Sequence, residues 1–331
     1  MSRQLAWVVG AGGLLGSHLV RRLSARPDQV ALWDGAGRLA WNEPDVLRGQ
    51  LDRIASRFAD AVAAGAHRSW ALFWTAGAGV VATAAADLDG ESAIFEFALQ
   101  RLRAHLERAR VSLPGCVFLA SSAGGVYGGT VDLPATESSA VMARSPYGAL
   151  KIRQEQLLER WAAETGLSCL VGRIANLYGP GQNLRKAQGL ISQLARSLVL
   201  NRPAHVYVPL DTVRDYLHVD DCARGITEAA AKLADQAIAR GPTRLTKIFA
   251  SEQPVSVAVV LGIFYRLARR RPRIIQATRP EAQLQPRCLA FRSEVWPDIA
   301  RARIGLPVGI RETYEDMLDQ YRTGALVGLA A

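Results

Sequence analysis

A glycine-rich turn between an apolar strand and a helix constrains the fold of this 331-residue chain more than any other feature. Residues 5–9 form a short apolar run typical of a buried strand, and Gly10, Gly13 and Gly16 follow it at a spacing of three. A helical pattern then occupies residues 14–23. Glycines at this spacing permit a tight turn, a close approach of the backbone to a pyrophosphate, and close packing of helix on strand. The sequence therefore predicts a dinucleotide-binding βαβ unit.

A carboxylate stands where such a unit would meet the adenosine ribose. The second predicted strand, residues 30–33, runs into Asp34, which lies 34 − 16 = 18 residues beyond the last glycine of the turn. An acid at this place repels a 2′-phosphate, so NAD is favoured over NADP, with Arg38 close enough to keep NADP as the alternative. The first helical residues, Leu14 and Leu15, would present the backbone N–H groups that face the phosphates.

Strands and helices alternate up to about residue 172, which predicts an α/β fold with a Rossmann doubly wound parallel sheet and helices on both faces. Residues 1–172 are predicted to form this domain, with some later segments returning to it, and residues 173–331 to form mainly a smaller C-terminal substrate lobe. The predicted elements are helices at 44–64, 91–110, 189–200 and 255–267 and strands at 70–74, 116–120, 168–172 and 205–208, with a short strand at 39–41 if one forms there.

Tyr147 and Lys151 are four residues apart at the start of an apolar-periodic helix, residues 147–163. Side chains at i and i+4 lie on one face of a helix, so the phenol and the ammonium form a usable pair. A nearby cation favours the phenolate, and we expect the pKa of Tyr147 to fall from its ordinary value of about 10. A tyrosine tuned in this way is a general acid/base.

Small and hydroxyl-bearing residues follow two of the predicted strands. Ala76 and Gly77 come after the strand at 70–74, and Ser121 and Ser122 come after the next strand along the chain. Ligands of open α/β sheets bind outside the carboxyl ends of the strands. We therefore expect these four residues to border the same site as the tyrosine and lysine, although serines in this position also serve as caps and turns.

Composition excludes several other classes of protein. The chain is 49% hydrophobic and 21% charged, as is usual for globular proteins, and it has no apolar run of the roughly 18 residues that a membrane span needs. No signal peptide is recognisable before the first strand, so we expect a cytoplasmic protein without membrane insertion. The four cysteines and five histidines lack metal-ligand spacing, so free buried thiols and no metal site are expected.

The chain is basic, with a net charge of +10. A basic protein can attract nucleic acid, but the densest cluster, residues 269–273, has no interleaved aromatic side chains and follows a predicted helix. We therefore expect an anionic small substrate and no nucleic-acid partner.

Together these motifs resemble the extended short-chain dehydrogenase/reductase family, specifically its NAD-dependent nucleotide-sugar epimerase/dehydratase group, typified by UDP-glucose 4-epimerase. The resemblance spans about residues 5–225, with the pieces in family order. They are Gly10/Gly13/Gly16, Asp34, the Ser-Ser…Val-Tyr-Gly segment at 121–128, Tyr147/Lys151, Arg173…Asn176-x-Tyr-Gly-Pro-Gly-Gln, and Arg214-Asp-Tyr-x-His-Val-x-Asp221.

The resemblance implies a chemical role for the central residues. Tyr147 would be the acid/base, and Lys151 would tune it and bind the nicotinamide ribose of NAD(P). Asn176 and Arg214 would contact the diphosphate of a nucleotide-sugar substrate. Family members also dimerise through two helices, which here would lie near 91–110 and 147–163.

The chain departs from the family pattern in several places. The family's catalytic Ser or Thr lies four residues before the Tyr of Val-Tyr-Gly, and that position holds Ala123, so Ser122 is the predicted substitute. The dehydratase pattern Thr-Asp-Glu is replaced by Ala-Gly-Gly at residues 123–125. The Asn of the family's Asn-x-x-Gly-Thr helix is not found, and the sugar-nucleotide pattern near the C-terminus is matched at best by residues 279–283.

Three functions are compatible with these residues. The first is an NAD-dependent epimerase that oxidises a sugar hydroxyl transiently, with Tyr147 as acid/base and Lys151 and Ser122 beside it. The second is an NAD(P)H-dependent reductase or dehydrogenase of a keto-sugar nucleotide, which would use the same tyrosine and lysine. The third is a non-catalytic NAD(P)-binding protein, which the retained Tyr-x-x-x-Lys pair disfavours. The sequence identifies neither the sugar nor the base of the nucleotide.

Overall fold

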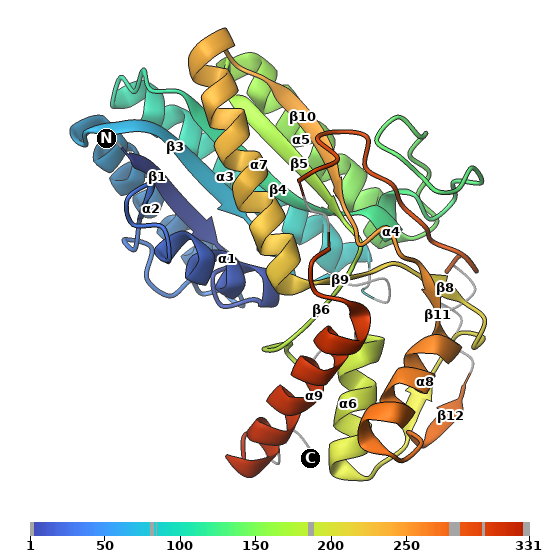
Figure 1. Ribbon diagram of the computed structural model, residues 1–331. Coiled ribbons are helices and arrows are strands. Elements are labelled where there is room, and N and C mark those ends of the chain that lie inside the picture. Colours follow the sequence, from blue (N-terminus) through green and yellow to red (C-terminus); the bar gives the residue numbers. More distant parts are fainter. Residues whose placement is uncertain are drawn as a thin grey trace.

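A computed structural model of the chain describes residues 3–79, 83, 85–184, 189–277, 285–299 and 302–326. A parallel sheet forms its centre, and a smaller lobe lies beyond the carboxyl ends of the strands (Figure 1). No helix in the described ranges is both long enough and apolar enough to cross a membrane.

The central sheet has six parallel strands among the described residues. From one edge to the other they are β10 (Arg244–Phe249), β5 (Ser168–Ile174), β4 (Gly115–Ser122), β3 (His67–Trp74), β1 (Arg3–Val9) and β2 (Val30–Leu32). The chain order reverses between β1 and β3, because β2 lies on one side of β1 and all later strands lie on the other. Ligands of open α/β sheets bind at such a switch point.

Helices cover both faces of this sheet (Figure 1). One face packs against α1 (Leu14–Ser24) and α7 (Val219–Arg240), and the other packs against α2 (Pro44–Ala64), α3 (Ala85–Arg108) and α5 (Pro146–Thr165). Burial on both sides explains why the inner strands are almost continuously apolar. The doubly wound α/β fold predicted from the sequence is therefore confirmed.

The sheet draws on late parts of the chain. β10 pairs in parallel with β5, from Arg244 opposite Cys169 to Phe249 opposite Ile174. α7 adds Cys222 and other apolar residues to the core cluster on its face of the sheet. Segments well beyond residue 172 thus complete the dinucleotide-type sheet.

The smaller lobe has its own apolar cluster, which includes Leu194, Phe264 and Ile310. Its helices are α6 (Leu190–Leu200), α8 (Val257–Ala268) and α9 (Leu306–Arg322). Its strands form pairs, β6 (Asn176–Tyr178) with β9 (Tyr216–His218), β8 (Val213–Arg214) with β11 (Val255–Ser256), and β7 (Ala204–Val206) with β12 (Ile274–Gln276). The predicted helices at 189–200 and 255–267 correspond to α6 and α8 within a residue or two at each end.

Two elements differ from the sequence-based expectation. No strand forms at residues 39–41, where the side chain of Gln50 accepts a hydrogen bond from Ala40 N at 2.8 Å and donates to Arg38 O at 3.3 Å. These bonds hold the segment as a loop against α2. Helix α3 begins at Ala85, six residues before the predicted start at 91. Two alanines, which favour helix, begin the added stretch, and the carboxylate of Asp87 lies in the first turn, where the helix dipole favours negative charge.

Candidate active site

The glycine turn has the close contacts that its sequence predicts. Gly10 has φ +89°, and a Cβ atom there would lie 2.7 Å from Ala76 N. A Cβ atom on Gly16 would lie 2.1 Å from Gly10 O. Gly13 donates from its backbone N to Gly10 O at 2.9 Å, which closes the turn. Two of the three glycines therefore occupy positions that no larger residue fits.

The first turn of α1 is open to an anionic ligand. Gly13 is its N-cap residue and supplies no side-chain cap, so the N–H groups of the first turn are not satisfied by a cap. Leu14 is half-buried and Leu15 is buried in the core under the helix. A helix N-terminus carries partial positive charge, and this one begins at the carboxyl end of β1.

Asp34 lies two residues beyond the end of β2 and is exposed. Because β2 neighbours β1, this carboxylate lies at the same edge of the sheet as the glycine turn. Ala76 and Gly77 follow β3, the other neighbour of β1, and the contact between Gly10 and Ala76 places them directly against the turn.

The side chains of Ser122 and Tyr147 lie close enough for the serine hydroxyl to lower the pKa of the phenol. Ser122 ends β4 and is the N-cap of the short helix α4 (Ala123–Val126), where its oxygen accepts from Gly125 N at 3.1 Å. That bond occupies an acceptor position and leaves the hydroxyl proton for the phenol. Tyr147 is in the first turn of α5, where Ser145 caps the helix by accepting from Gly148 N at 3.1 Å. Ser122, which lies two strands away from the glycine turn, is thus close to Tyr147, as the sequence pattern predicts.

The pKa of Tyr147 does not fall in this structure, which contradicts the sequence-based expectation. Burial raises it to about 12, the hydrogen bond from Ser122 opposes this, and the negative charge of Glu91 raises it further. Lys151 Nζ lies 5.8 Å from the centroid of the tyrosine ring, and it donates to Ala120 O at 3.2 Å and to the side-chain oxygen of Gln154 at 3.0 Å. The ammonium donates to these oxygens, and burial is the largest influence on the pKa of the phenol.

Lys151 itself is buried, and burial lowers its pKa, while the charges of Glu91 and Glu155 raise it. Two carboxylates on different helices therefore oppose the desolvation of this ammonium. Neither carboxylate was predicted from the sequence to lie at this site.

Ser121 does not point at the site. Its hydroxyl donates to Glu155, a short hydrogen bond within the buried interior. Glu155 also holds Arg173, whose Nη2 lies 2.7 Å from Oε2, and Arg173 Nη1 donates to the Tyr127 hydroxyl at 2.5 Å. Tyr127 in turn donates to Thr136 O at 2.8 Å. A cofactor contact of Ser121 would therefore involve its backbone, since the side chain belongs to this network.

Burial alone would lower the pKa of Arg173, but the hydrogen bonds and charge of Glu155 outweigh it and raise the pKa above its ordinary value. Glu155 stands four residues after Lys151, on the same row of the helix as Tyr147. This spacing is the signal that could have identified Glu155 from the sequence. Glu91 carries no such signal, because its partners are backbone groups.

Asn176 and Arg214 lie in neighbouring segments of the smaller lobe. Asn176 N donates to Asp215 O at 3.1 Å, next to Arg214 in the chain. Arg214 is buried, which lowers its pKa, and its guanidinium donates to Val213 O at 2.8 Å and to Gln285 Oε1 at 3.2 Å. No carboxylate forms an ion pair with it within the described ranges. The candidate sugar-nucleotide pattern at 279–283 lies outside the described residues.

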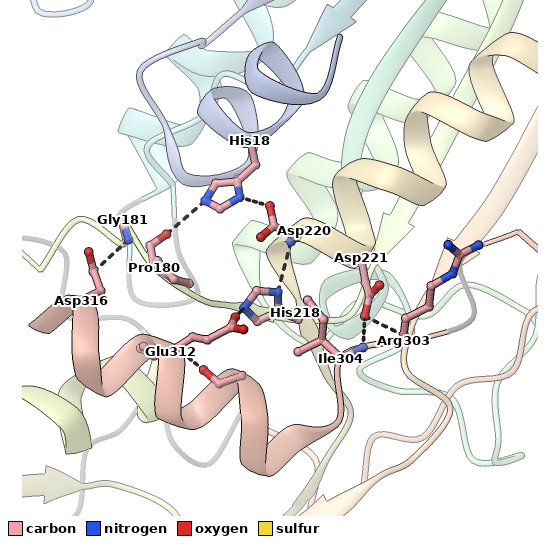
Figure 2. A network of polar contacts seen from close by, with 12 residues as sticks. His18, Pro180, Gly181, His218, Asp220, Asp221, Arg303, Ile304, Glu312 and Asp316 are labelled. Atoms are coloured by element: carbon pink, nitrogen blue, oxygen red, sulfur yellow. Dashed lines mark hydrogen bonds and ion pairs between the residues drawn. The ribbon is translucent and has the colours of Figure 1, made fainter. Parts of the chain in front are cut away.

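A polar network links the helix after the glycine turn to the smaller lobe (Figure 2). His18 in α1 contacts Asp220 Oδ1 through Nδ1 at 2.5 Å and Pro180 O through Nε2 at 3.1 Å. Each ring nitrogen of His18 thus faces an oxygen atom. The next residue, Gly181, donates from its backbone N to Asp316 in α9 at 3.0 Å. The helix that follows the glycine turn is thereby connected to the smaller lobe through His18.

Comparison with known proteins identifies relatives over much of the chain. The sequence profile of the NAD dependent epimerase/dehydratase family matches residues 6–239. The dTDP-L-rhamnose 4-epimerase of Burkholderia thailandensis is 30% identical over 134 residues, which make up 40% of this chain and only 33% of that protein. The UDP-glucose 4-epimerase of Mycolicibacterium smegmatis is 25% identical over 236 residues, 67% of this chain and 72% of that protein.

Solved structures share the fold over nearly the whole chain. The structure of the Thermus thermophilus UDP-glucose 4-epimerase in complex with NAD superposes with a TM-score of 0.74 at 22% identity, and the match covers 95% of this chain and 99% of that one. The related sequences include proteins named as sugar-nucleotide epimerases, dehydratases and a reductase. On the extent of the profile match and the shared fold, the chain belongs to the NAD dependent epimerase/dehydratase family of enzymes.

Proposed function

We propose that this protein is an NAD-dependent epimerase of a nucleotide-diphosphate sugar that works by transient oxidation of a sugar hydroxyl. The observation that carries the proposal is the grouping of Ser122, Tyr147 and the buried ammonium of Lys151, whose Nζ lies 5.8 Å from the centroid of the tyrosine ring. A phenol, a hydroxyl and an ammonium in this arrangement are suited to moving one proton to and from an alcohol.

The residues at the edge of the sheet fit a dinucleotide. A Cβ atom at Gly10 or Gly16 would collide with backbone atoms, so the turn has no side chains at these positions and a ligand can approach its backbone. The uncapped N-terminus of α1 supplies N–H donors. The exposed carboxylate of Asp34 suits the two hydroxyls of an adenosine ribose and disfavours a 2′-phosphate. When bound, NAD supplies a hydride acceptor that is regenerated in the same catalytic cycle.

The chain's own groups handle the proton. Tyr147 Oη exchanges the proton of the reacting hydroxyl, and Ser122 holds the phenol by donating to it. At neutral pH a phenol with a pKa of about 12 is protonated, which suits it to donate a proton to a developing alkoxide. To accept a proton, it requires additional positive charge nearby, which the nicotinamide ring of NAD would add to that of Lys151.

The phosphates of the substrate would meet Arg214 and Asn176. Arg214 carries a buried cation without a carboxylate partner in the described part of the chain, and its planar guanidinium suits bidentate contact with a diphosphate. Asn176 offers a side-chain amide from the adjoining strand β6.

A reductase or dehydrogenase of a keto-sugar nucleotide is the second candidate. It is favoured by one relative named as a dTDP-4-dehydro-6-deoxyglucose reductase, which is 32% identical over 109 residues. Elimination of water is disfavoured, since Ala123, Gly124 and Gly125 provide neither an acid nor a base.

Incubating the purified protein with a panel of nucleotide-diphosphate sugars, NAD and NADP tests the proposal. An epimerase converts a sugar into its epimer without net change in absorbance at 340 nm, whereas a reductase oxidises NAD(P)H stoichiometrically with its keto substrate. Stoichiometric consumption with no epimer formed would favour the second candidate over the first.

Asp34→Ala is expected to weaken NAD binding by about 1.5–3 kcal/mol, the contribution of charge-assisted hydrogen bonds to the ribose. NADP binding should improve relative to NAD, because the carboxylate that repels a 2′-phosphate is gone. Calorimetric titration of both cofactors against both proteins measures the change. Tighter binding of NADP than of NAD by the wild type would contradict the assignment.

Arg214→Ala is expected to weaken nucleotide-sugar binding by about tenfold or more, since a charged hydrogen bond contributes about 1.5–3 kcal/mol. NAD affinity should stay near that of the wild type and shows that the variant is folded. Arg287→Ala is the matched control, because Arg287 is exposed and paired with Asp211. An equal loss of both ligands in Arg214→Ala would show that the arginine does not serve the sugar nucleotide.

We also propose a homodimer formed through α3 and α5. The two helices lie side by side on one face of the sheet and are tied by the ion pairs Arg153–Asp89 and Arg103–Glu164. Phe97 in α3 is half-buried, which leaves part of an aromatic side chain for a partner helix. Sedimentation equilibrium distinguishes the dimer from a monomer of 35.8 kDa.

A further inference from the structure

The carboxylate of Glu91 lies where three elements meet beside the candidate site. Glu91 is in the second turn of α3, and its Oε1 accepts hydrogen bonds from the backbone N–H groups of Ala78 and Gly79, both at 2.6 Å. These two residues belong to the segment that leaves the carboxyl end of β3, next to the glycine turn. One oxygen of Glu91 therefore fixes a segment that borders the proposed dinucleotide site.

The other oxygen of the same carboxylate faces Lys151. A Cβ atom added to Gly77 would lie 3.4 Å from Glu91 Oε2 and 3.9 Å from Lys151 Nζ. Both charged atoms lie within 4 Å of one point, which places them no more than 3.4 + 3.9 = 7.3 Å apart. They form no direct ion pair within 4.0 Å among the described residues, so they interact at this longer range through their charges.

Glu91 differs in one respect from Glu155, the other carboxylate near Lys151. Glu155 is bound to Arg173 and accepts from Ser121, so a buried cation already balances its charge. Glu91 is hydrogen-bonded by backbone groups and has no cation within ion-pair distance in the described ranges. Within these ranges, the negative charge of Glu91 is therefore not balanced by a paired cation.

Among the described residues, the remaining groups around the pair carry no charge that could replace that of Glu91. β4 presents the Ala120 carbonyl and the Ser122 hydroxyl, and α5 presents the Gln154 amide. Both Lys151 and Tyr147 respond to Glu91 in the same sense, because a negative charge raises the pKa of each.

We propose that Glu91 is a positioning residue for the Tyr147–Lys151 pair, in which one oxygen anchors the segment after β3 and the other keeps the buried ammonium of Lys151 charged. This inference rests on the proposed function, in which a charged Lys151 assists the tyrosine. The carboxylate acts on the reacting proton only through Lys151 and Tyr147. An amide at position 91 would keep the anchor and lose the charge, so the two roles are separable.

Titration of Lys151 in the ligand-free protein tests the electrostatic role. The chain contains only four lysines, so ¹³Cε-labelled lysine gives few NMR signals, and Lys151→Arg identifies the one that matters. Glu91→Gln can still accept the two backbone hydrogen bonds through its amide oxygen. We expect its Lys151 midpoint to move to lower pH by about two to three units, the effect of one unit charge between roughly 4 and 7 Å away for an effective dielectric constant near 20.

Two further variants complete the test. Glu96→Gln, an exposed glutamate on the same helix, should leave the Lys151 midpoint unchanged. Glu91→Asp keeps the charge but is one methylene shorter. The Lys151 midpoint should therefore stay close to that of the wild type, while the KM for the cofactor should rise because the segment after β3 is held less well. A Lys151 midpoint in Glu91→Gln equal to that of the wild type would overturn the proposal.

Turnover supplies a second readout. In Glu91→Gln both limbs of the pH–rate profile should move to lower pH, because the phenol and the ammonium each lose their protons more readily. A purely structural role of Glu91 would lower the rate without moving the limbs. Since the NMR titration needs neither substrate nor turnover, it decides the role of Glu91 even if the protein proves not to be an epimerase.

Discussion

Tyr147→Phe should reduce kcat by about 10²- to 10⁴-fold, the contribution of a positioned acid/base, while NAD still binds. Only the hydroxyl is removed, so the ring keeps its packing in the first turn of α5, and the bond from Ser122 is lost with its acceptor. Steady-state turnover of a nucleotide sugar measures the loss, and calorimetry with NAD provides the folding control. Full activity of Tyr147→Phe would exclude the dehydrogenase-type mechanism for this protein.

Ser122→Ala is the matched comparison. The phenol stays in place but loses its hydrogen-bond donor, and α4 loses its N-cap. A reduction of kcat by at least about tenfold, or 1.4 kcal/mol, is expected. Unchanged turnover in Ser122→Ala together with loss of turnover in Tyr147→Phe would mean that the tyrosine works without this serine.

Arg173→Met is expected to lower the free energy of unfolding by about 3–5 kcal/mol, because it leaves the Glu155 carboxylate buried without its cation. The side chains of Arg173 and Glu155 are only 10% and 5% exposed, and the guanidinium also bonds the Tyr127 hydroxyl. Urea-induced unfolding followed by tryptophan fluorescence measures the change.

Arg153→Met is the matched control for that experiment. Arg153 pairs with Asp89 at 2.9 Å, but the two side chains are 50% and 62% exposed. Exposed pairs of this kind contribute about 0–1 kcal/mol. Comparable losses of unfolding free energy in the two variants would show that burial of the Arg173–Glu155 pair does not contribute to stability.

The sheet and the glycine turn could be predicted because their signals are local. An apolar run followed by three spaced glycines describes β1 and the start of α1, and the predicted bounds of α2 coincide with Pro44–Ala64. The meeting of Ser122 and Tyr147 followed from the rule that strand ends share one edge of a parallel sheet.

Groups whose partners are distant in sequence or are backbone atoms could not be found this way. The bond between Glu91 and the N–H groups of Ala78 and Gly79 depends on how α3 returns over the end of β3. The pKa of Tyr147 was predicted with the wrong sign, because an i, i+4 spacing reports the approach of Lys151 but not the burial of the phenol. Burial is a property of the whole fold, and here it is the largest influence on the pKa of the phenol.

The order in which the strands enter the sheet has a consequence for biosynthesis. By the time β5 is complete at Ile174, the ribosome has already made the glycine turn, Asp34, Tyr147 and Lys151. The outer edge of β5 then waits for β10, which ends at Phe249, a further 249 − 174 = 75 residues away. At about 5–20 residues per second this interval lasts roughly 4–15 s. Throughout it the nascent chain displays an unpaired parallel edge, which is open to pairing with other nascent chains, and until α7 is made at Val219–Arg240 one apolar face of the sheet also lacks that helix.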